Sequence, residues 1–87
     1  MPMNYEINIR KKAMKFIQKQ EMKQQRRIIT AIYKLPSEGD VKKMKGEDNL
    51  YRLRVGDYRV LFEMLPQDKT LILIDVTHAD NRGQVYK

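Results

Sequence analysis

The stretch LYRLRVGDYRVLF, residues 50–62, decides the fold of this chain. Apolar residues alternate with polar ones on both sides of Gly56 and Asp57, which is the pattern of β-strands that bury one face. A Gly-Asp pair suits a two-residue hairpin loop, because glycine adopts the positive φ that such loops require. The stretch therefore predicts a β-hairpin, with strands over residues 50–55 and 58–65.

Three arginines, Arg52, Arg54 and Arg59, fall on one face of this predicted hairpin. A two-residue loop fixes the register and places Arg54 directly opposite Arg59. Like charges at that spacing destabilise a sheet, because the opposed Cβ atoms are only about 4.5–5.5 Å apart. A bound anion would relieve the repulsion, since each guanidinium offers a planar fork of donors that fits phosphate oxygens. We therefore interpret the three arginines as a site for a backbone phosphate.

Two alternatives to a phosphate site stay open from the sequence. Long arginine side chains can splay apart into water, where they need no ligand. They can also pair with carboxylates of the same chain, for which the candidates are Asp57, Glu63, Asp75 and Asp80. Either arrangement would make the arginines part of an ordinary solvated surface.

The residues before the hairpin predict one strand and two helices. Residues 3–9 alternate apolar and polar side chains, which indicates a strand. Two apolar stripes at helical spacing follow, over residues 9–17 and 22–35, but the first stripe does not continue in phase into the second. Two antiparallel helices separated near residues 20–23 bury both stripes, whereas one straight helix does not. Pro36 then ends the second helix.

After the helices, residues 41–49 are polar and indicate an irregular approach to the sheet. A last strand is predicted over residues 70–77, and its start is apolar on both faces, which favours a central, doubly covered position. The register of this strand stays open, because a four-residue turn before it and a five-residue turn would point opposite faces of the strand toward the core. The sequence therefore does not say which face of the sheet carries Asp75 and Thr77. The order β-α-α-β-β-β predicts a single α+β domain over residues 1–87, an antiparallel β-sheet with the N-terminal helical hairpin packed on one face.

The composition limits what such a domain can do. The chain has 87 residues, a net charge of +7 and no cysteine, so disulfides and thiolate metal sites are excluded. The basic charge favours a polyanionic partner such as a nucleic acid or an acidic protein. No apolar run reaches the roughly 18 residues of a membrane span, so we expect a soluble cytoplasmic protein with no membrane partner.

The remaining chemical groups are few. His78 is the only histidine, and with no cysteine present a metal site is not expected. We interpret His78 as a surface or strand-end residue rather than a catalyst. Tyr86 lies near the C-terminus, close in sequence to Arg82. There it would either pack the tail of the chain or act on a ligand, by proton transfer or by stacking on a base.

Two segments, MKGEDNLYRLRVGDYRVLFEM and DVTHADNRGQVYK, carry a resemblance to a known family. Together with the first strand and the basic helix pair, they resemble the RelE branch of the RelE/ParE superfamily, the toxins of type II toxin–antitoxin modules. The resemblance covers nearly the whole chain. It implies a small α+β toxin that uses no metal or cofactor and that cleaves mRNA in the ribosomal A site, where a 2′-hydroxyl attacks the adjacent phosphate.

The resemblance also implies roles for individual residues. By position, the catalytic residues of the family fall on Arg52, Arg54, Arg59 and Tyr86. The basic residues that help to hold RNA fall on Lys45 and Arg82. The chain departs from the pattern in two ways, because Asp80 stands where RelE-type toxins commonly carry a basic residue, and arginines replace the lysines that are common on the first hairpin strand.

The implied partners are a cognate antitoxin protein and the ribosome with its mRNA. Operator DNA is reached only through the toxin–antitoxin complex. Two other functions remain open from the sequence. The ParE type of toxin shares the fold, does not cleave RNA and inhibits DNA gyrase, and an inactive nucleic-acid-binding protein is the third alternative.

Overall fold

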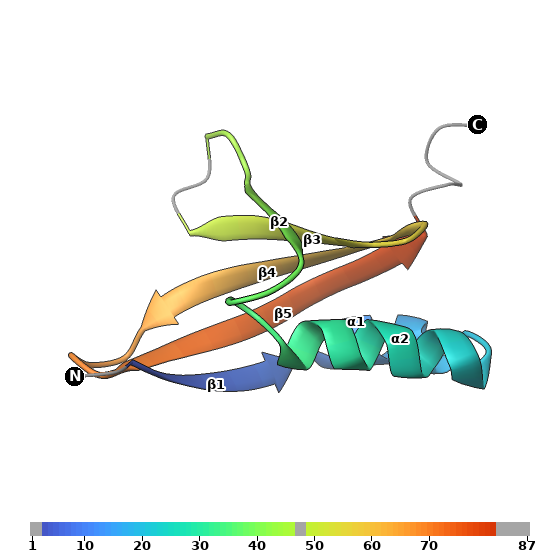
Figure 1. Cartoon of the computed structure of the whole chain (residues 1–87), viewed down its shortest axis with the longest axis horizontal. Helices are drawn as coiled ribbons and strands as arrows, with labels where there is room; N and C mark the ends of the chain where they lie inside the picture. The colour runs from blue at the N-terminus through green and yellow to red at the C-terminus, as the bar shows by residue number, and fades with distance from the viewer. Residues whose placement is uncertain (1–2, 47–48, 82–87) are drawn as a thin grey trace.

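The chain folds into a five-stranded sheet with two helices on the same side of it (Figure 1). The computed structural model describes residues 3–46 and 49–81. In chain order the elements are β1 (Asn4–Ile9), α1 (Lys11–Gln18), α2 (Met22–Tyr33), β2 (Asp40–Lys43), β3 (Leu50–Val55), β4 (Tyr58–Pro66) and β5 (Leu71–Asn81). The predicted α+β class and the two separate helices are confirmed. Neither helix is long and apolar enough to cross a membrane.

The sheet is mixed rather than purely antiparallel. Its strand order is β1-β5-β4-β3-β2, in which β1 runs parallel to β5 and the other neighbouring pairs are antiparallel. The predicted antiparallel sheet is therefore wrong at β1. A hairpin turn forces the strands that it joins to be antiparallel. The strands β1 and β5 come from opposite ends of the chain, and no such turn sets their relative direction.

A second correction concerns β2, which lies where the sequence indicates an irregular segment. Its four residues pair with the edge of β3, so that Asp40 lies opposite Arg54 and Lys42 lies opposite Arg52. Lysines are common on edge strands, because they discourage pairing with further chains. Val41 is the single apolar residue of β2, which is too little alternation to predict a strand.

The hairpin of β3 and β4 forms in the predicted register. Gly56 has a φ of 59°, the positive value that the two-residue loop needs. Val55 pairs with Tyr58, and Arg54 pairs with Arg59, as expected. The one difference is small, since β4 ends one residue later than predicted.

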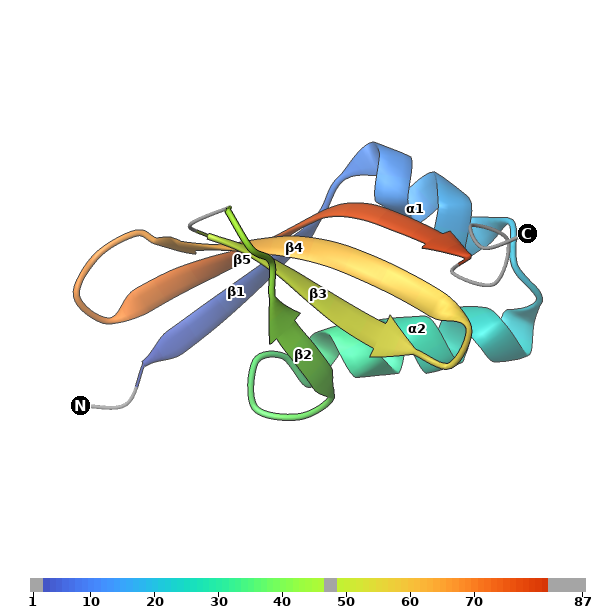
Figure 2. The same cartoon turned by 90° about the horizontal axis from the view of Figure 1, so that it is seen from above.

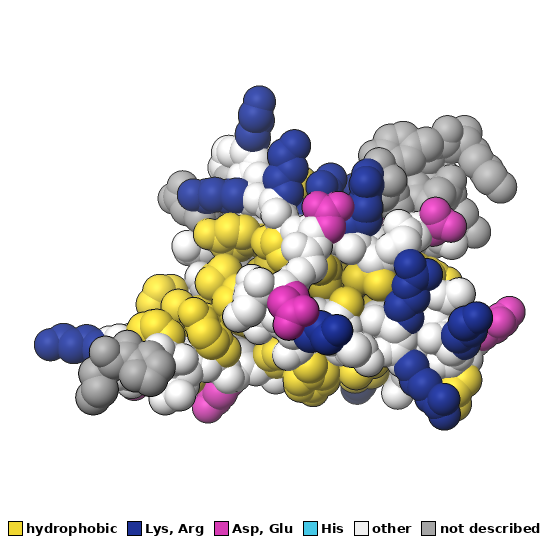
Figure 3. Space-filling model, in the orientation of Figure 1, with side chains coloured by type: hydrophobic (Ala, Val, Ile, Leu, Met, Phe, Trp, Pro, Cys, Tyr) yellow, Lys and Arg dark blue, Asp and Glu magenta, His cyan; other side chains and the backbone are white. Residues whose placement is uncertain are grey.

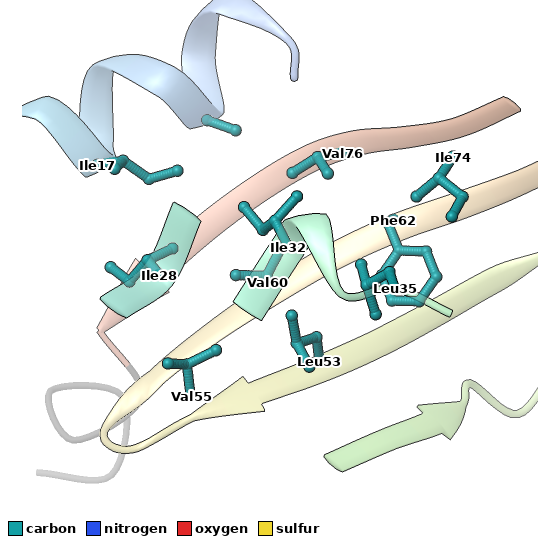
Figure 4. Close-up of a cluster of buried hydrophobic side chains, with 11 residues drawn as sticks. Ile17, Ile28, Ile32, Leu35, Leu53, Val55, Val60, Phe62, Ile74 and Val76 are labelled. Atoms are coloured by element: carbon teal, nitrogen blue, oxygen red, sulfur yellow. The ribbon is translucent and has the colours of Figure 1, made fainter. Parts of the chain in front are cut away.

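The helices cover one face of this sheet, with α1 beside β5 and α2 beside β3 (Figure 2). The break between them spans residues 19–21, close to the predicted position. Their buried side chains meet the apolar face of the sheet (Figure 4), and they are Ala13, Ile17, Ile28 and Ile32. The sheet contributes Leu53, Val55, Val60, Phe62, Ile74 and Val76. Burial of each large aliphatic or aromatic side chain stabilises the fold by about 1.5–3 kcal/mol.

The last strand, β5, is longer than predicted and contains a β-bulge. It continues to Asn81, beyond the predicted end at residue 77, and so includes Asp80. Leu61 of β4 pairs with His78, whereas the next residue of β4 pairs with Val76, so Thr77 is an extra residue. The bulge settles the register that the sequence left open.

The start of β5 corrects one further expectation. The strand is interior in the sheet, as predicted, but residues 71–73 are only half-buried. Both helices lie on the same side of the sheet, so neither covers the other face. The predicted double cover is therefore wrong for this part of the strand.

Asp75 ties β1 to β5 on the face away from the helices. Arg10 donates to its Oδ2 from Nε at 3.0 Å and from a terminal nitrogen at 2.8 Å, and Asn8 donates to its Oδ1 at 2.9 Å. The hydrogen bond from Arg10 is the main cause that lowers the pKa of Asp75, although burial acts in the opposite direction. Because Arg10 directly precedes α1, this contact fixes the start of the helix on the sheet.

Candidate functional site

The face of the sheet that points away from the helices, called the open face below, carries the three predicted arginines. Arg52 and Arg54 on β3 alternate with the buried residues Leu53 and Val55, which point toward the helices. Arg59 on β4 pairs directly with Arg54 and therefore lies on the same face. The three guanidinium groups thus come from two neighbouring strands of a rigid sheet.

Four charged residues form a row across the open face, which we call the paired row. It consists of Asp40 on β2, Arg54 on β3, Arg59 on β4 and Asp80 on β5, each directly opposite the next. A terminal nitrogen of Arg59 lies 2.9 Å from Oδ2 of Asp80, and Nε of Arg54 lies 4.0 Å from Oδ2 of Asp40. Two carboxylates flank two arginines, and the formal charges of the row cancel.

The paired row shows one of the alternatives that the sequence left open, a carboxylate partner, for Arg59. Asp80 was one of the candidate carboxylate partners, and Arg59 has that partner. Because 26% of the Arg59 side chain and 41% of the Asp80 side chain are exposed, the pair stabilises the fold by about 1 kcal/mol or less. Arg54 makes the longer contact to Asp40, and its Nε is buried without a hydrogen bond to any described residue.

A second row lies beside the paired row and carries a net positive charge, and we call it the cationic row. It consists of Lys42 on β2, Arg52 on β3, Leu61 on β4 and His78 on β5. Lys42 and Arg52 are a second pair of directly opposed like charges. Neither takes part in the ion pairs found within residues 3–46 and 49–81.

Sequence reasoning missed Lys42 and Asp40 as members of the site. Both lie on β2, and without that strand there was no reason to place them beside Arg52 and Arg54. The only signal in the sequence is the position of Val41 between them, since an apolar residue facing the helices sends its neighbours to the open face. One apolar residue is a weak signal on its own.

The other predicted site residues are less closely grouped. Lys45 is exposed in the turn that follows β2, at the opposite end of β3 from Arg54. His78 is exposed on the open face. Arg82 and Tyr86 lie outside the described residues. In the part of the chain that the structure describes, no three His, Cys, Asp or Glu side chains group as metal ligands.

A groove of about 930 Å³ lies between α2 and β3, beside the open face. Its basic lining residues are Lys23, Arg26, Arg27, Lys34 and Arg54. Apolar surface lies between these charges, from Met22, Ala31, Leu53 and Val55. The guanidinium of Arg27 rests against Gly56 in the hairpin turn, where an added Cβ would come within 3.0 Å of its terminal nitrogens. Figure 3 shows Lys and Arg side chains gathered over α2 and over the β2–β3 edge.

Comparison with known proteins identifies the family. A family profile described as "ParE toxin of type II toxin-antitoxin system, parDE" matches residues 7–83. The chain belongs to this family, within the RelE/ParE superfamily. Among curated relatives, the RelE1 protein of Methanocaldococcus jannaschii is 34% identical over 41 residues. That match spans 47% of this chain and 46% of the relative, about half the length of each.

Solved structures of RelE–RelB complexes contain chains with the same fold. The archaeal complex from Pyrococcus horikoshii OT3 matches with a TM-score of 0.69 and 30% identity, over 94% of this chain and 99% of that one. The complex from Methanococcus jannaschii matches with a TM-score of 0.64 and 26% identity, over 90% and 93%. The RelBE2 complex from Mycobacterium tuberculosis, at a TM-score of 0.67 and 18% identity over 90% and 98%, shares the fold alone. The predicted resemblance to this superfamily is confirmed.

Proposed function

We propose that this chain is the toxin of a type II toxin–antitoxin module and that it cleaves mRNA in the ribosomal A site without a metal ion. The observation that carries the proposal is the group of three arginines on the open face of a RelE-like fold. Cations fixed on a rigid sheet suit phosphodiester cleavage, because they stabilise the charge that develops on the phosphate in the transition state. Action on translated mRNA places the protein in the cytoplasm.

The proposed reaction is an intramolecular transfer at phosphorus. The 2′-oxygen of one nucleotide forms a new bond to the adjacent phosphorus, and the bond from phosphorus to the 5′-oxygen of the next nucleotide breaks. Arg52 and Arg54 would hold the non-bridging oxygens, and Arg59, positioned by Asp80, would add a third cation. Arginine stays protonated and is a poor base. Proton transfer therefore falls to Tyr86.

Residues away from the phosphate would hold the rest of the RNA. Lys45 and Arg82 are assigned this role, in which each contact releases counterions and makes binding sensitive to salt. The ribosome would present the mRNA as a single strand to the open face. Its support for the substrate explains why so small a domain can act without a deep active-site cleft.

The proposed partner that restrains the toxin is a cognate antitoxin. The groove beside α2 and the open face are both basic, so an antitoxin segment that covers them should carry acidic residues. The solved structures with this fold are complexes of RelE with RelB, which supports a partner of that kind. Contact with operator DNA would occur only through the toxin–antitoxin complex.

Primer extension on mRNA from cells that express the protein tests the activity. The wild type should produce new 5′ ends within translated codons, and Arg59→Ala should remove them together with the growth arrest. Loss of one transition-state cation lowers such rates by about 10²–10³-fold. Lys69→Ala is the matched control, because Lys69 is an exposed cation in the turn between β4 and β5. A folded Arg59→Ala variant that still cuts mRNA and stays toxic would contradict the assignment.

A second candidate function is inhibition of DNA gyrase, because the matching family profile is described as ParE toxin. A toxin of that type needs neither the arginine group nor Tyr86. Expression would then produce DNA breaks and leave transcripts intact, and Arg59→Ala would keep its toxicity. An inactive nucleic-acid-binding protein would produce neither breaks nor cleaved transcripts.

A further inference from the structure

The two rows on the open face differ in how their charges are balanced. The paired row carries a carboxylate at each end, which compensates its two arginines within the fold. The cationic row has an apolar residue and a histidine, Leu61 and His78, in the equivalent places. An incoming anion is therefore attracted to Lys42 and Arg52 more strongly than to the arginines of the paired row.

The geometry at Arg52 also indicates an anion. Its Nε is buried and makes no hydrogen bond within the described part of the chain. A buried N–H without an acceptor costs free energy, and a charged one costs more. Lys42 lies directly opposite, where two like charges destabilise the strand pair. An oxyanion between the two side chains would accept from the terminal nitrogens of Arg52 and attract Lys42, and it would relieve the repulsion between the two cations.

The other half of the cationic row has the chemistry of a base platform. Leu61 offers a half-buried apolar surface, and His78 offers an exposed planar ring. Nδ1 of His78 lies 3.1 Å from Oγ1 of Thr77, the bulge residue, and this contact steadies the ring. Nucleobases stack on histidine and other flat side chains in proteins that bind single-stranded RNA.

The spacing of the row matches a nucleotide laid across the strands. Neighbouring strands lie about 4.8 Å apart, so Leu61 is about 5 Å and His78 about 10 Å from Arg52 across the sheet. A phosphate at Lys42 and Arg52 therefore leaves room for the attached sugar and base over Leu61 and His78. Residues of the paired row border this path on one side.

We propose that the cationic row is a subsite for one RNA nucleotide, with its phosphate held by Lys42 and Arg52 and its base stacked on Leu61 and His78. The proposal rests on the proposed function in taking single-stranded RNA as the ligand. It adds three residues, Lys42, Leu61 and His78, to those that the family resemblance assigns. It also sets the direction of the RNA, which crosses the β-strands instead of following them.

Two neighbouring lysines test the phosphate half. Lys42 and Lys43 are both exposed and adjacent on β2, but they lie on opposite faces of the sheet. Binding of a fluorescent hexaadenylate RNA to the purified protein is measured by anisotropy over a range of salt. Lys42→Gln should weaken binding and reduce the slope of log affinity against log salt by about 0.7, whereas Lys43→Gln should leave both unchanged. Equal effects of the two variants overturn the phosphate assignment.

Two substitutions of the histidine test the base half. His78→Ala should lower the affinity for the same RNA by about fivefold or more, the loss of one stacked base. His78→Phe should retain the wild-type affinity, because a phenyl ring stacks but cannot hydrogen-bond. The stacking assignment is overturned if His78→Ala binds the RNA with full affinity. It is also overturned if His78→Phe loses as much affinity as His78→Ala. Far-UV circular dichroism confirms the fold of each variant.

A titration followed by NMR separates phosphate binding from nucleotide binding. Inorganic phosphate should shift the signals of Lys42 and Arg52 and leave those of Leu61 and His78 unchanged, whereas the dinucleotide adenylyl-(3′→5′)-adenosine should also shift the Leu61 methyl and His78 ring signals. Identical shifts with both probes overturn the base half. If mRNA is cleaved in cells while the Lys42 and His78 variants bind RNA like the wild type, the subsite fails and the proposed function stands. If the wild type neither binds RNA nor cleaves mRNA, both fail.

Discussion

Replacement of Asp80 by asparagine should strengthen the binding of RNA to the open face. The carboxylate of Asp80 lies two strands from Arg54, a distance of about 10 Å at the usual strand spacing. Over that distance it repels a phosphate by about 0.4 kcal/mol in water and by about 1.7 kcal/mol at the lower effective dielectric constant near a protein surface. Asparagine keeps the shape and removes the charge, so the affinity should rise by between about twofold and about 20-fold.

The assay is anisotropy of a fluorescent short RNA, recorded at low and at high salt. Glu21→Gln is the matched control, because it removes one negative charge from an exposed residue at the start of α2 that makes no capping hydrogen bond. The gain in Asp80→Asn should shrink at high salt, where the Debye length falls below the separation. An affinity that is unchanged or lower in a folded Asp80→Asn protein would refute the reasoning. Asp80 would then act only by positioning Arg59.

Three further predictions concern stability. Gly56→Ala should destabilise the protein in urea unfolding by more than Gly46→Ala, because both have positive φ but only at Gly56 does the added Cβ meet the guanidinium of Arg27. Leu53→Ala should lower the free energy of unfolding by about 2–5 kcal/mol in the same assay, since Leu53 is fully buried. The pKa of Asp75 is lowered in the folded state, so its contribution is complete above the unfolded value near pH 4 and is lost as the pH falls through the folded value. Acid titrations of stability should therefore show a smaller loss below about pH 4 in Asp75→Asn than in the wild type.

Local patterns in the sequence were enough to predict the hairpin and its charged face. The alternation of residues 50–55 and the Gly-Asp loop fix a register that depends only on neighbours in the chain. The placement of Arg54 directly opposite Arg59 followed from that register. The break between the helices was predictable for the same reason, because the phase of an apolar stripe is a local property.

Features that depend on distant segments could not be predicted in the same way. The parallel pairing of β1 with β5 joins residues far apart in the sequence, and alternation says nothing about direction. The segment β2 forms a strand because it pairs with the edge of β3, and its own residues do not favour a strand. The site residues Asp40 and Lys42 were missed for this reason. The partnership of Arg59 with Asp80 was one of several carboxylate options until the register of β5 was known.

The extra residue in β5 makes this strand tolerant of a one-residue loss at one point. Before Thr77 the side chains that face the helices are those of Ile74 and Val76, and after it the face changes phase, so that His78 and Asp80 emerge on the opposite side. Deletion of that one residue would restore simple alternation and keep Leu61 opposite His78 and Arg59 opposite Asp80, so the imidazole and the carboxylate would stay on the open face. A residue added in the loop between β4 and β5 would be absorbed by the turn. Both one-residue changes, the loss at position 77 and the gain in that loop, would therefore leave the pairing of β4 with the end of β5 in place.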